Sequence, residues 1–375
     1  MTINRREFLT ATATTACMAN LASEAMAAES GLKIQTVSGD VDPKSLGVVL
    51  THEHAPIVDW SELFETQRAP LEPVRKRIVT RTAKLLDEFS GSLKHWKGAG
   101  AVVETTPIRV GRYPLLLAEL AKHTKVDIIA STGFWCEALA PQHPWAVRMS
   151  VEKGGAERMA DLFIREITEG MEDPFGQWGE KFTDIKAGII KIGTSTYLRP
   201  SERICHHAAA IASKKTGCPI TTHTTNGGGL EEAELLLKLG CDPGRVVIGH
   251  QGYQDDRNND QAHDYHTLIA KLGCYVQFDR VGHGNYKCKS QAQQIQKLVE
   301  AGYVKQVLIS HDHAPFVCSN FDAPKKTEAN WKELEADYTV VTTELLHELK
   351  ELGISNADIS TMLVDNPQRM LAFAK

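Results

Sequence analysis

Two closely spaced histidines, His52 and His54, directly follow the apolar run at 47–51. Such a run predicts a buried β-strand, and alternate side chains of a strand lie on the same face of the sheet. The two imidazoles should therefore point the same way, while Glu53 points elsewhere. Two imidazoles on one face can bind a metal ion from one side, although a lone His-x-His pair is weak evidence for a metal site.

Four further apolar runs end in, or contain, an ionisable residue. Histidine ends two of them, at His223 and His250, Asp312 follows a third, and Lys191 lies inside a fourth. Each residue alone has an ordinary explanation, because a strand-end histidine is more often a hydrogen-bonded core residue and a buried lysine usually pairs with a carboxylate. All of them at the same end of five strands would instead form one ionisable cluster.

Lys191 differs from the other candidates because an ammonium group has three N–H donors and no acceptor, so it cannot ligate a cation. Burial lowers the pKa of a lysine, and the neutral amine can then add carbon dioxide to form a carbamate. The two anionic oxygens of an N6-carboxylated Lys191 could bridge two divalent ions. Four imidazoles and two anionic oxygen groups suit Zn²⁺, with Co²⁺ and Mn²⁺ as alternatives.

The six candidates can be divided between two ions. His52 and His54 would bind one ion, His223 and His250 the other, and Asp312 would complete the shell. Two ions held close together lower the pKa of a shared water toward neutrality and so supply hydroxide, whose proton Asp312 can accept. The sequence contains no Gly-x-Ser-x-Gly, which disfavours a serine hydrolase.

The six candidate ligands can meet only if their strands lie parallel in one sheet, and parallel strands are usually connected by helices. We predict strands at 47–51, 101–105, 126–131, 188–192, 219–223, 245–249, 274–278 and 306–310, and helices at 71–89, 115–122, 156–169, 203–214, 230–239, 291–300, 338–352 and 357–373. This alternation favours a closed (β/α)8 TIM barrel, which we expect to follow a short β-hairpin within 32–46. An open doubly wound sheet is the main alternative, although no Gly-x-Gly-x-x-Gly follows the first strand. A polar loop is predicted at 322–337.

The composition is that of an ordinary soluble globular protein, since 42% of the 375 residues are hydrophobic and 24% are charged. The net charge of −5 and the pI near 6.3 provide no basic field for nucleic acid. No window is apolar over the length of a membrane span. Without Cys17 the number of cysteines is odd, so at least one thiol is unpaired within the chain, and most should be small buried hydrophobes.

The first 28 residues predict an export signal. Arg5 and Arg6 precede an Ala/Thr-rich apolar run, and Ala25 and Ala27 are small residues suited to cleavage. The paired arginines favour the twin-arginine pathway, and a basic disordered tail is the alternative. We therefore expect the protein in the periplasm, with residues 29–375 forming a single domain.

The chain resembles the phosphotriesterase family of the amidohydrolase superfamily, which includes organophosphate hydrolases and phosphotriesterase-like lactonases. The motifs that carry the resemblance cover nearly the whole chain after the predicted signal: Gly47-Val-Val-Leu-Thr-His-Glu-His54, Glu104-Thr-Thr-Pro, Gly111-Arg112, Ser131-Thr-Gly133, Ile190-Lys191-Ile192, Thr222-His223-Thr224, Gly249-His250, Phe278-Asp279-Arg280, Ile309-Ser-His-Asp312 and Asp365-Asn366-Pro367. The resemblance implies a (β/α)8 barrel and a homodimer.

The resemblance also implies a role for each candidate ligand. His52, His54 and Asp312 would hold the more buried ion. Carboxylated Lys191 would bridge the two ions, and the more exposed ion would be bound by His223 and His250.

The resemblance implies a hydrolase of lactones or other esters with side activity on organophosphate triesters. A dedicated phosphotriesterase and a non-catalytic periplasmic binding protein are the alternatives. Arg280, after Asp279, matches the lactonase branch, whereas Trp135 falls where organophosphate hydrolases tend to carry tryptophan and lactonases tyrosine. The two cues point in opposite directions, and Trp135 also fits plain packing. The segment 171–186 is longer than is usual in the family, and a surface loop or a partner contact is our interpretation of it.

Overall fold

The computed structural model describes residues 31–58, 71–108, 110–135, 144–175, 181–195, 197–225, 227–252, 259–318, 331–333 and 335–374. The predicted export signal, Cys17, Cys136 and most of the predicted loop at 322–337 lie outside these residues.

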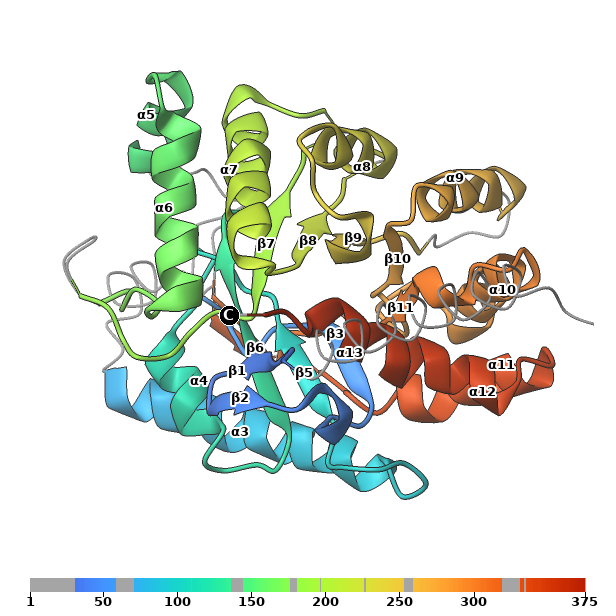
Figure 1. The fold of residues 1–375 in the computed structure, drawn as a ribbon. Coiled ribbons are helices and arrows are strands. Elements are labelled where there is room, and N and C mark those ends of the chain that lie inside the picture. Colours follow the sequence, from blue (N-terminus) through green and yellow to red (C-terminus); the bar gives the residue numbers. More distant parts are fainter. Residues whose placement is uncertain are drawn as a thin grey trace, which may run out of the picture.

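Eight parallel strands form one sheet in the order β11-β10-β9-β8-β7-β6-β5-β3. The strands are β3 Val49–Glu53, β5 Ala101–Glu104, β6 Asp127–Gly133, β7 Ile189–Gly193, β8 Ile220–His223, β9 Val246–Ile248, β10 Tyr275–Phe278 and β11 Val307–Ile309. The first and last strands meet, because Asp312 donates its N–H to His52 O at 3.0 Å and His54 donates to His313 O at 2.9 Å. The fold is the predicted (β/α)8 barrel (Figure 1).

The helices surround the strands in Figure 1. They are α3 Leu71–Ser92, α4 Pro114–Leu120, α5 Pro144–Val151, α6 Gly155–Thr168, α7 Pro200–Thr216, α8 Gly229–Lys238, α9 Asn259–Lys271, α10 Cys288–Glu300, α11 Leu346–Glu351, α12 Asn356–Ser360 and α13 Asn366–Leu371, with π-helical turns at η6 Val341–Leu345 and η7 Thr361–Asp365. In α6, Met159, Phe163 and Ile167 are buried at four-residue spacing, so one face packs against the barrel. Every predicted helix is present, whereas α5 and α9 had no predicted counterpart.

The strands read as apolar runs because both of their faces are covered. Leu50 belongs to the core shared with the helices, whereas Val49 belongs to a cluster formed mainly by other strand residues, which lies inside the barrel. Strict alternation from Leu50 would turn His52 toward the helices. The register of β3 against β5 shifts between Leu50 and Glu53, and such a bulge re-aims side chains. His52 consequently points inward.

The predicted hairpin is present and covers the amino-terminal end of the barrel. Strands β1 (Ile34–Thr36) and β2 (Gly39–Val41) pair antiparallel. Val37 donates its N–H to Ile128 O at 2.9 Å, near the start of β6. Lys33 forms a bridge with Phe373, so both ends of the described chain lie at this end of the barrel.

Segment 171–186 begins and ends as an antiparallel hairpin, with 176–180 outside the described residues. Thr183 donates its N–H to Met171 O at 2.8 Å, and Asp173 donates to Lys181 O at 2.9 Å. The hairpin is attached to α6, because Glu166 Oε1 accepts the N–H of Glu172 at 3.0 Å. The segment is therefore an ordered addition to the barrel over its described part.

A small three-stranded sheet has no predicted counterpart. It contains β4 Ile57–Val58, β12 Phe316–Cys318 and β13 Trp331–Glu333. The predicted loop at 322–337 is therefore wrong for 331–333, which pair with β12, a strand that itself pairs with β4 about 260 positions away in the sequence. Local sequence does not encode such a pairing.

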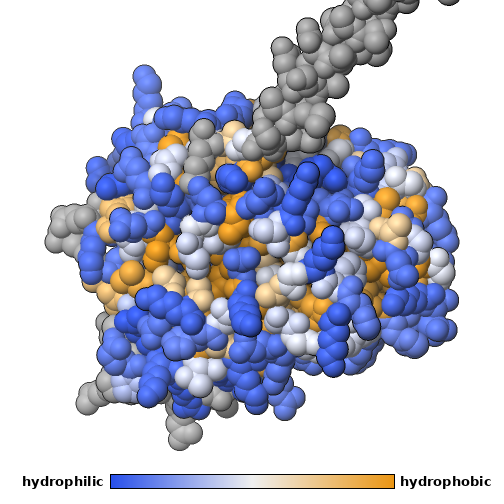
Figure 2. Space-filling view, turned by 60° about the horizontal axis from the view of Figure 1, so that its bottom comes forward, coloured by the Kyte–Doolittle hydropathy of each residue, from blue (hydrophilic) through white to orange (hydrophobic). Residues whose placement is uncertain are grey.

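The described surface mixes hydrophilic and hydrophobic residues on the face shown in Figure 2. Within the described residues, no helix is long and apolar enough to cross a membrane. Among the described residues, the cysteines that form no disulfide are all buried, as predicted. They are Cys205, Cys218, Cys241, Cys274 and Cys288.

Candidate metal centre

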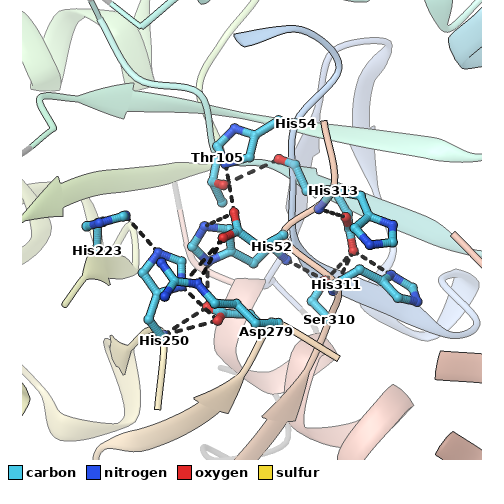
Figure 3. A network of polar contacts seen from close by, with 12 residues as sticks. His52, His54, Thr105, His223, His250, Asp279, Ser310, His311 and His313 are labelled. Atoms are coloured by element: carbon cyan, nitrogen blue, oxygen red, sulfur yellow. Dashed lines mark hydrogen bonds and ion pairs between the residues drawn. The ribbon is translucent and has the colours of Figure 1, made fainter. Parts of the chain in front are cut away.

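The structure gathers the six predicted ligands at the carboxyl ends of the barrel strands. They come from β3 (His52, and His54 just after it), β7 (Lys191), the end of β8 (His223) and the residues after β9 (His250) and β11 (Asp312). Figure 3 shows the imidazoles of this cluster around His52. The barrel thus brings together residues that lie up to 260 positions apart in the sequence.

His52, His54 and Asp312 form a compact group. Asp312 Oδ1 lies 3.2 Å from His54 Nε2 and 3.6 Å from His52 Nε2. Each residue offers one ligand atom, and the three atoms lie within 4.8 Å of one another, so the group could hold a metal ion. Imidazole nitrogen together with carboxylate oxygen suits Zn²⁺.

His223, His250 and Lys191 lie beside this group. His223 Nδ1 is 2.7 Å from His250 Nε2, and the ring centroids of His250 and His52 are 4.8 Å apart. Lys191 is 2% exposed, and its Nζ atom lies 2.7 Å from His52 Nε2. The buried amine is therefore adjacent to the ligand atom of His52.

Asp279, the residue after β10, orients two of the imidazoles. It accepts hydrogen bonds from Nδ1 of His52 and from Nδ1 of His250, both at 2.8 Å. Each ring therefore carries its proton on Nδ1 and directs the lone pair of Nε2 toward the other predicted ligands. Asp279 was predicted only as part of a motif, and its orienting role was not predicted, although its position at a strand end was an available signal.

Thr106 orients His54 in the same way. The Thr106 hydroxyl donates its proton to the Glu104 carboxylate, so it accepts the hydrogen bond from His54 Nδ1 at 2.7 Å. The lone pair of His54 Nε2 then faces Asp312 Oδ1 at 3.2 Å. Two acceptors at this distance repel each other unless a proton or a cation lies between them. The cluster therefore fits a bound divalent ion.

The ionisation states also fit metal binding. Burial lowers the pKa of His54, lowers that of His223 well below its ordinary value, and lowers that of His250 to about 4. Near pH 7 these rings are neutral, which is the form that ligates metals. Burial alone would raise the pKa of the Asp312 carboxyl, but His250, His54 and His52 hold it well below its usual range. Asp312 is therefore an anionic ligand.

His250 and Asp312 both have a left-handed backbone, with φ of 56° and 59°. This conformation costs a residue with a side chain about 1–3 kcal/mol and concentrates at functional sites. Asp279 compensates at one position, since its Oδ2 accepts the His250 N–H at 3.0 Å. At the other position the Asp312 N–H is bound by His52 O.

The two predicted pocket residues each contact a predicted ligand. Arg280 donates from Nε to Asp312 Oδ2 at 3.3 Å and from Nη1 to Tyr286 at 3.1 Å. Trp135 packs edge-on against His223 with ring centroids 5.0 Å apart. Arg280 and Trp135 therefore lie at the edge of the cluster.

A (β/α)8 barrel with neutral imidazoles and an ionised carboxylate at its strand tips defines a metal-dependent hydrolase. The chain belongs to the phosphotriesterase family, whose model matches residues 32–371. Family membership, together with the aryldialkylphosphatase and PTE-like lactonase among its relatives, supports a hydrolase that acts on ester bonds.

Relatives match the chain over nearly their whole length. The phosphotriesterase homology protein of Mycobacterium tuberculosis is 30% identical, with 90% of this chain and 97% of the relative covered. The aryldialkylphosphatase of Saccharolobus solfataricus is 27% identical (91% and 100% covered), and the N-acetyltaurine hydrolase of Rattus norvegicus is 28% identical (91% and 98% covered). A mutant PTE-like lactonase of Deinococcus radiodurans superposes with a TM-score of 0.74 at 28% identity, covering 90% of this chain and 99% of that one.

Proposed function

We propose that the protein is a binuclear metal-dependent hydrolase of lactones or other carboxylic esters, with side activity on organophosphate triesters. The observation that carries the proposal is the convergence of His52, His54 and Asp312, whose ligand atoms lie within 4.8 Å of one another. These three residues would hold one ion. His223 and His250 would hold the second, and Lys191 as a carbamate would bridge the two.

Bound divalent ions would supply a water of lowered pKa and a Lewis acid for the carbonyl or phosphoryl oxygen of the substrate. The residues supply the remaining functions. Asp312, held ionised, accepts a proton on its carboxylate, and the Arg280 guanidinium at Oδ2 restricts the orientation of that carboxylate. The neutral imidazoles add no positive charge that would compete with the ions. Zn²⁺ suits this donor set, with Co²⁺ and Mn²⁺ as alternatives.

Arg280 supports the lactone preference, since it matches the residue that shapes the pocket loop in the lactonase branch. Trp135 supports the alternative, a dedicated phosphotriesterase. Amide hydrolysis is a second candidate function. The N-acetyltaurine hydrolase relative acts, by its name, on a substrate with an anionic end, and the partly exposed Arg280 could pair with such a group.

A substrate panel tests these assignments. Protein loaded with two equivalents of Zn²⁺ or Co²⁺, verified by mass spectrometry, would be assayed with an acyl-homoserine lactone, a paraoxon-like triester and N-acetyltaurine. We expect kcat/KM for the lactone to exceed that for the triester by at least about tenfold, or 1.4 kcal/mol in transition-state free energy. Preference for the triester or the amide would select the corresponding alternative. Absence of turnover from the fully loaded protein would favour the binding-protein alternative.

We also infer that the protein acts in the periplasm as a single domain at 29–375, after export by the twin-arginine pathway and removal of 1–28. The paired Arg5 and Arg6 support this inference. Replacing both by lysine should leave the full-length chain in the cytoplasmic fraction. A homodimer is proposed on the family resemblance, and light scattering of the purified protein would test it.

A further inference from the structure

Glu53 lies between His52 and His54 in the sequence but is not one of the predicted ligands. It is 2% exposed, and its carboxylate contacts the segment that follows β11. Figure 3 shows Ser310, His311 and His313 of this segment grouped together beside His52. A carboxylate buried in this position needs an explanation, because burying a carboxylate is costly unless hydrogen bonds compensate for the lost water.

The Glu53 carboxylate accepts four hydrogen bonds from residues on both sides of Asp312. Oε1 accepts from Ser310 Oγ at 2.7 Å, from the His311 backbone N–H at 2.9 Å and from His311 Nδ1 at 2.8 Å. Oε2 accepts the His313 backbone N–H at 2.9 Å. Hydrogen bonds to an ionised acceptor are roughly twice as strong as neutral ones.

These contacts account for the left-handed backbone of Asp312. The N–H groups of His311 and His313, which flank it, converge on one carboxylate, as in the anion-binding concavities that form at left-handed residues. The N–H of Asp312 itself is bound by His52 O at 3.0 Å. All three consecutive amides are therefore held by the end of β3.

The side chains of His311 and Ser310, which donate to Glu53, also accept hydrogen bonds from backbone N–H groups, and these bonds fix their protons. His311 Nε2 accepts the Val341 N–H at 2.9 Å at the start of η6, so the proton of His311 lies on Nδ1 and is donated to Glu53. Ser310 Oγ accepts the His52 N–H at 2.9 Å, which leaves its own proton for Glu53. No alternative arrangement of these protons satisfies the same contacts.

We propose that Glu53 is a positioning residue whose carboxylate holds residues 310–313 in the turn that directs Asp312 toward His52 and His54. It thereby sets the affinity of the ion site formed by those three residues. The inference rests on the proposed function, because it takes these residues as ligands of one ion. Glutamine at position 53 would place an NH2 group against N–H donors, so at least one donor would lose its acceptor and the turn would relax.

The test is a Co²⁺ titration of the metal-free full-length protein, followed by visible absorption. In Glu53→Gln we expect one of the two ions to bind about 10–100-fold more weakly, as is typical when an outer partner of a metal ligand is lost. The other ion should bind as in the wild type. In the loaded enzyme kcat should fall while KM stays nearly unchanged, because the substrate contacts remain.

Glu202→Gln is the matched control. Glu202 is also buried, and it accepts the Ser195 N–H at 3.0 Å, the Ser195 hydroxyl at 2.5 Å and the Arg199 N–H at 2.8 Å. The turn it holds contains none of the predicted ligands. This variant should lose stability as Glu53→Gln does, yet bind both Co²⁺ ions with wild-type affinity.

Ser310→Ala decides the question if Glu53→Gln does not fold. It removes one donor from Glu53 together with the acceptor of the His52 N–H, and should weaken one Co²⁺ site by about tenfold, with faster amide exchange at 310–313. Wild-type Co²⁺ affinity in Glu53→Gln overturns the inference. If Glu53→Gln is unfolded, wild-type Co²⁺ affinity in Ser310→Ala overturns it. A wild-type protein that binds no Co²⁺ would instead refute the proposed function, and this inference with it.

Discussion

At the scale of single residues, the predicted ligands and the residues that orient them differ in how visible they are in the sequence. Lys191 and His250 stand out because ionisable side chains are rare in apolar runs. Asp279 also follows an apolar run, but no residue type or spacing marks Asp279, Thr106 or Glu53 as a residue that orients a ligand. Their roles follow from hydrogen bonds between strands far apart in the sequence, which only the fold reveals.

Replacing Lys191 by alanine should abolish activity, because the proposed bridging carbamate is lost. The rate should fall by more than the roughly 100-fold that is typical when a residue hydrogen-bonded to a metal ligand is removed. A short carboxylic acid added to the assay should restore part of the rate. Steady-state kinetics on the preferred ester measures both effects. Lys186→Ala, which removes a partly exposed lysine just before β7, is the control and should remain active. Wild-type-like rates in Lys191→Ala would eliminate the bridging role.

Glu104 should make the stability depend on pH. Burial raises the pKa of its carboxyl from 4.5 to about 7. Because the pKa is higher in the folded state, Glu104 contributes its full stabilisation of the fold below pH 4.5. This contribution, at most about 3 kcal/mol of unfolding free energy, is lost as the pH rises through 7. Glu104→Gln, which mimics the neutral acid, should flatten the unfolding free energy between pH 4.5 and 7. Urea unfolding at several pH values measures this. Parallel curves for the two proteins would contradict the assignment.

At the scale of secondary structure, all eight barrel strands were predictable, because strands covered on both faces read as apolar runs. The bulge in β3 was not, since a register shift depends on the neighbouring strand. Nor was the pairing of β4 with β12, which joins two short segments about 260 residues apart. Alternation from Leu50 alone would have turned His52 toward the helices, so its inward direction depends on the bulge, which the sequence does not show.

Gly133 tests the contact between β6 and the strand that carries Lys191. It has φ of 104°, and a Cβ atom there would clash with the carbonyl oxygen of Lys191. Gly133→Ala should therefore push the two strands apart, destabilise the protein by about 3 kcal/mol or more, and remove activity. Gly302→Ala is the control, because Gly302 also has a positive φ of 86° but open space around it. It should cost about 1 kcal/mol and leave activity intact. Thermal unfolding and kinetics of both variants make the comparison, and equal melting temperatures would count against the clash.

At the scale of the whole molecule, stability and chemistry occupy opposite ends of the barrel. The hairpin of β1 and β2 and the C-terminal residues cover the amino-terminal end, whereas the predicted ligands lie at the carboxyl ends of the strands. This division is general in barrels of this kind, in which the loops after the strands carry function. Substitutions at the two ends should therefore have separable effects.

Phe373→Ala tests this separation. Phe373 is 3% exposed and pairs with Lys33 through two backbone hydrogen bonds of 3.1 and 3.0 Å. Loss of the ring should cost about 3–5 kcal/mol of unfolding free energy. The kcat of the folded variant should remain within about twofold of the wild type, because the change lies far from the ligands. Unfolding curves and kinetics at a temperature where the variant is folded provide the measurement. A large fall in kcat would show that the two ends are coupled.

The location of Phe373 also bears on how the protein could be used. The last described residues lie beside β1 (Figure 1), so a tether attached beyond them would leave from the end of the barrel opposite the predicted ligands. A resin-bound or fusion-linked form joined through its carboxyl terminus should therefore keep the carboxyl ends of the barrel strands facing solution.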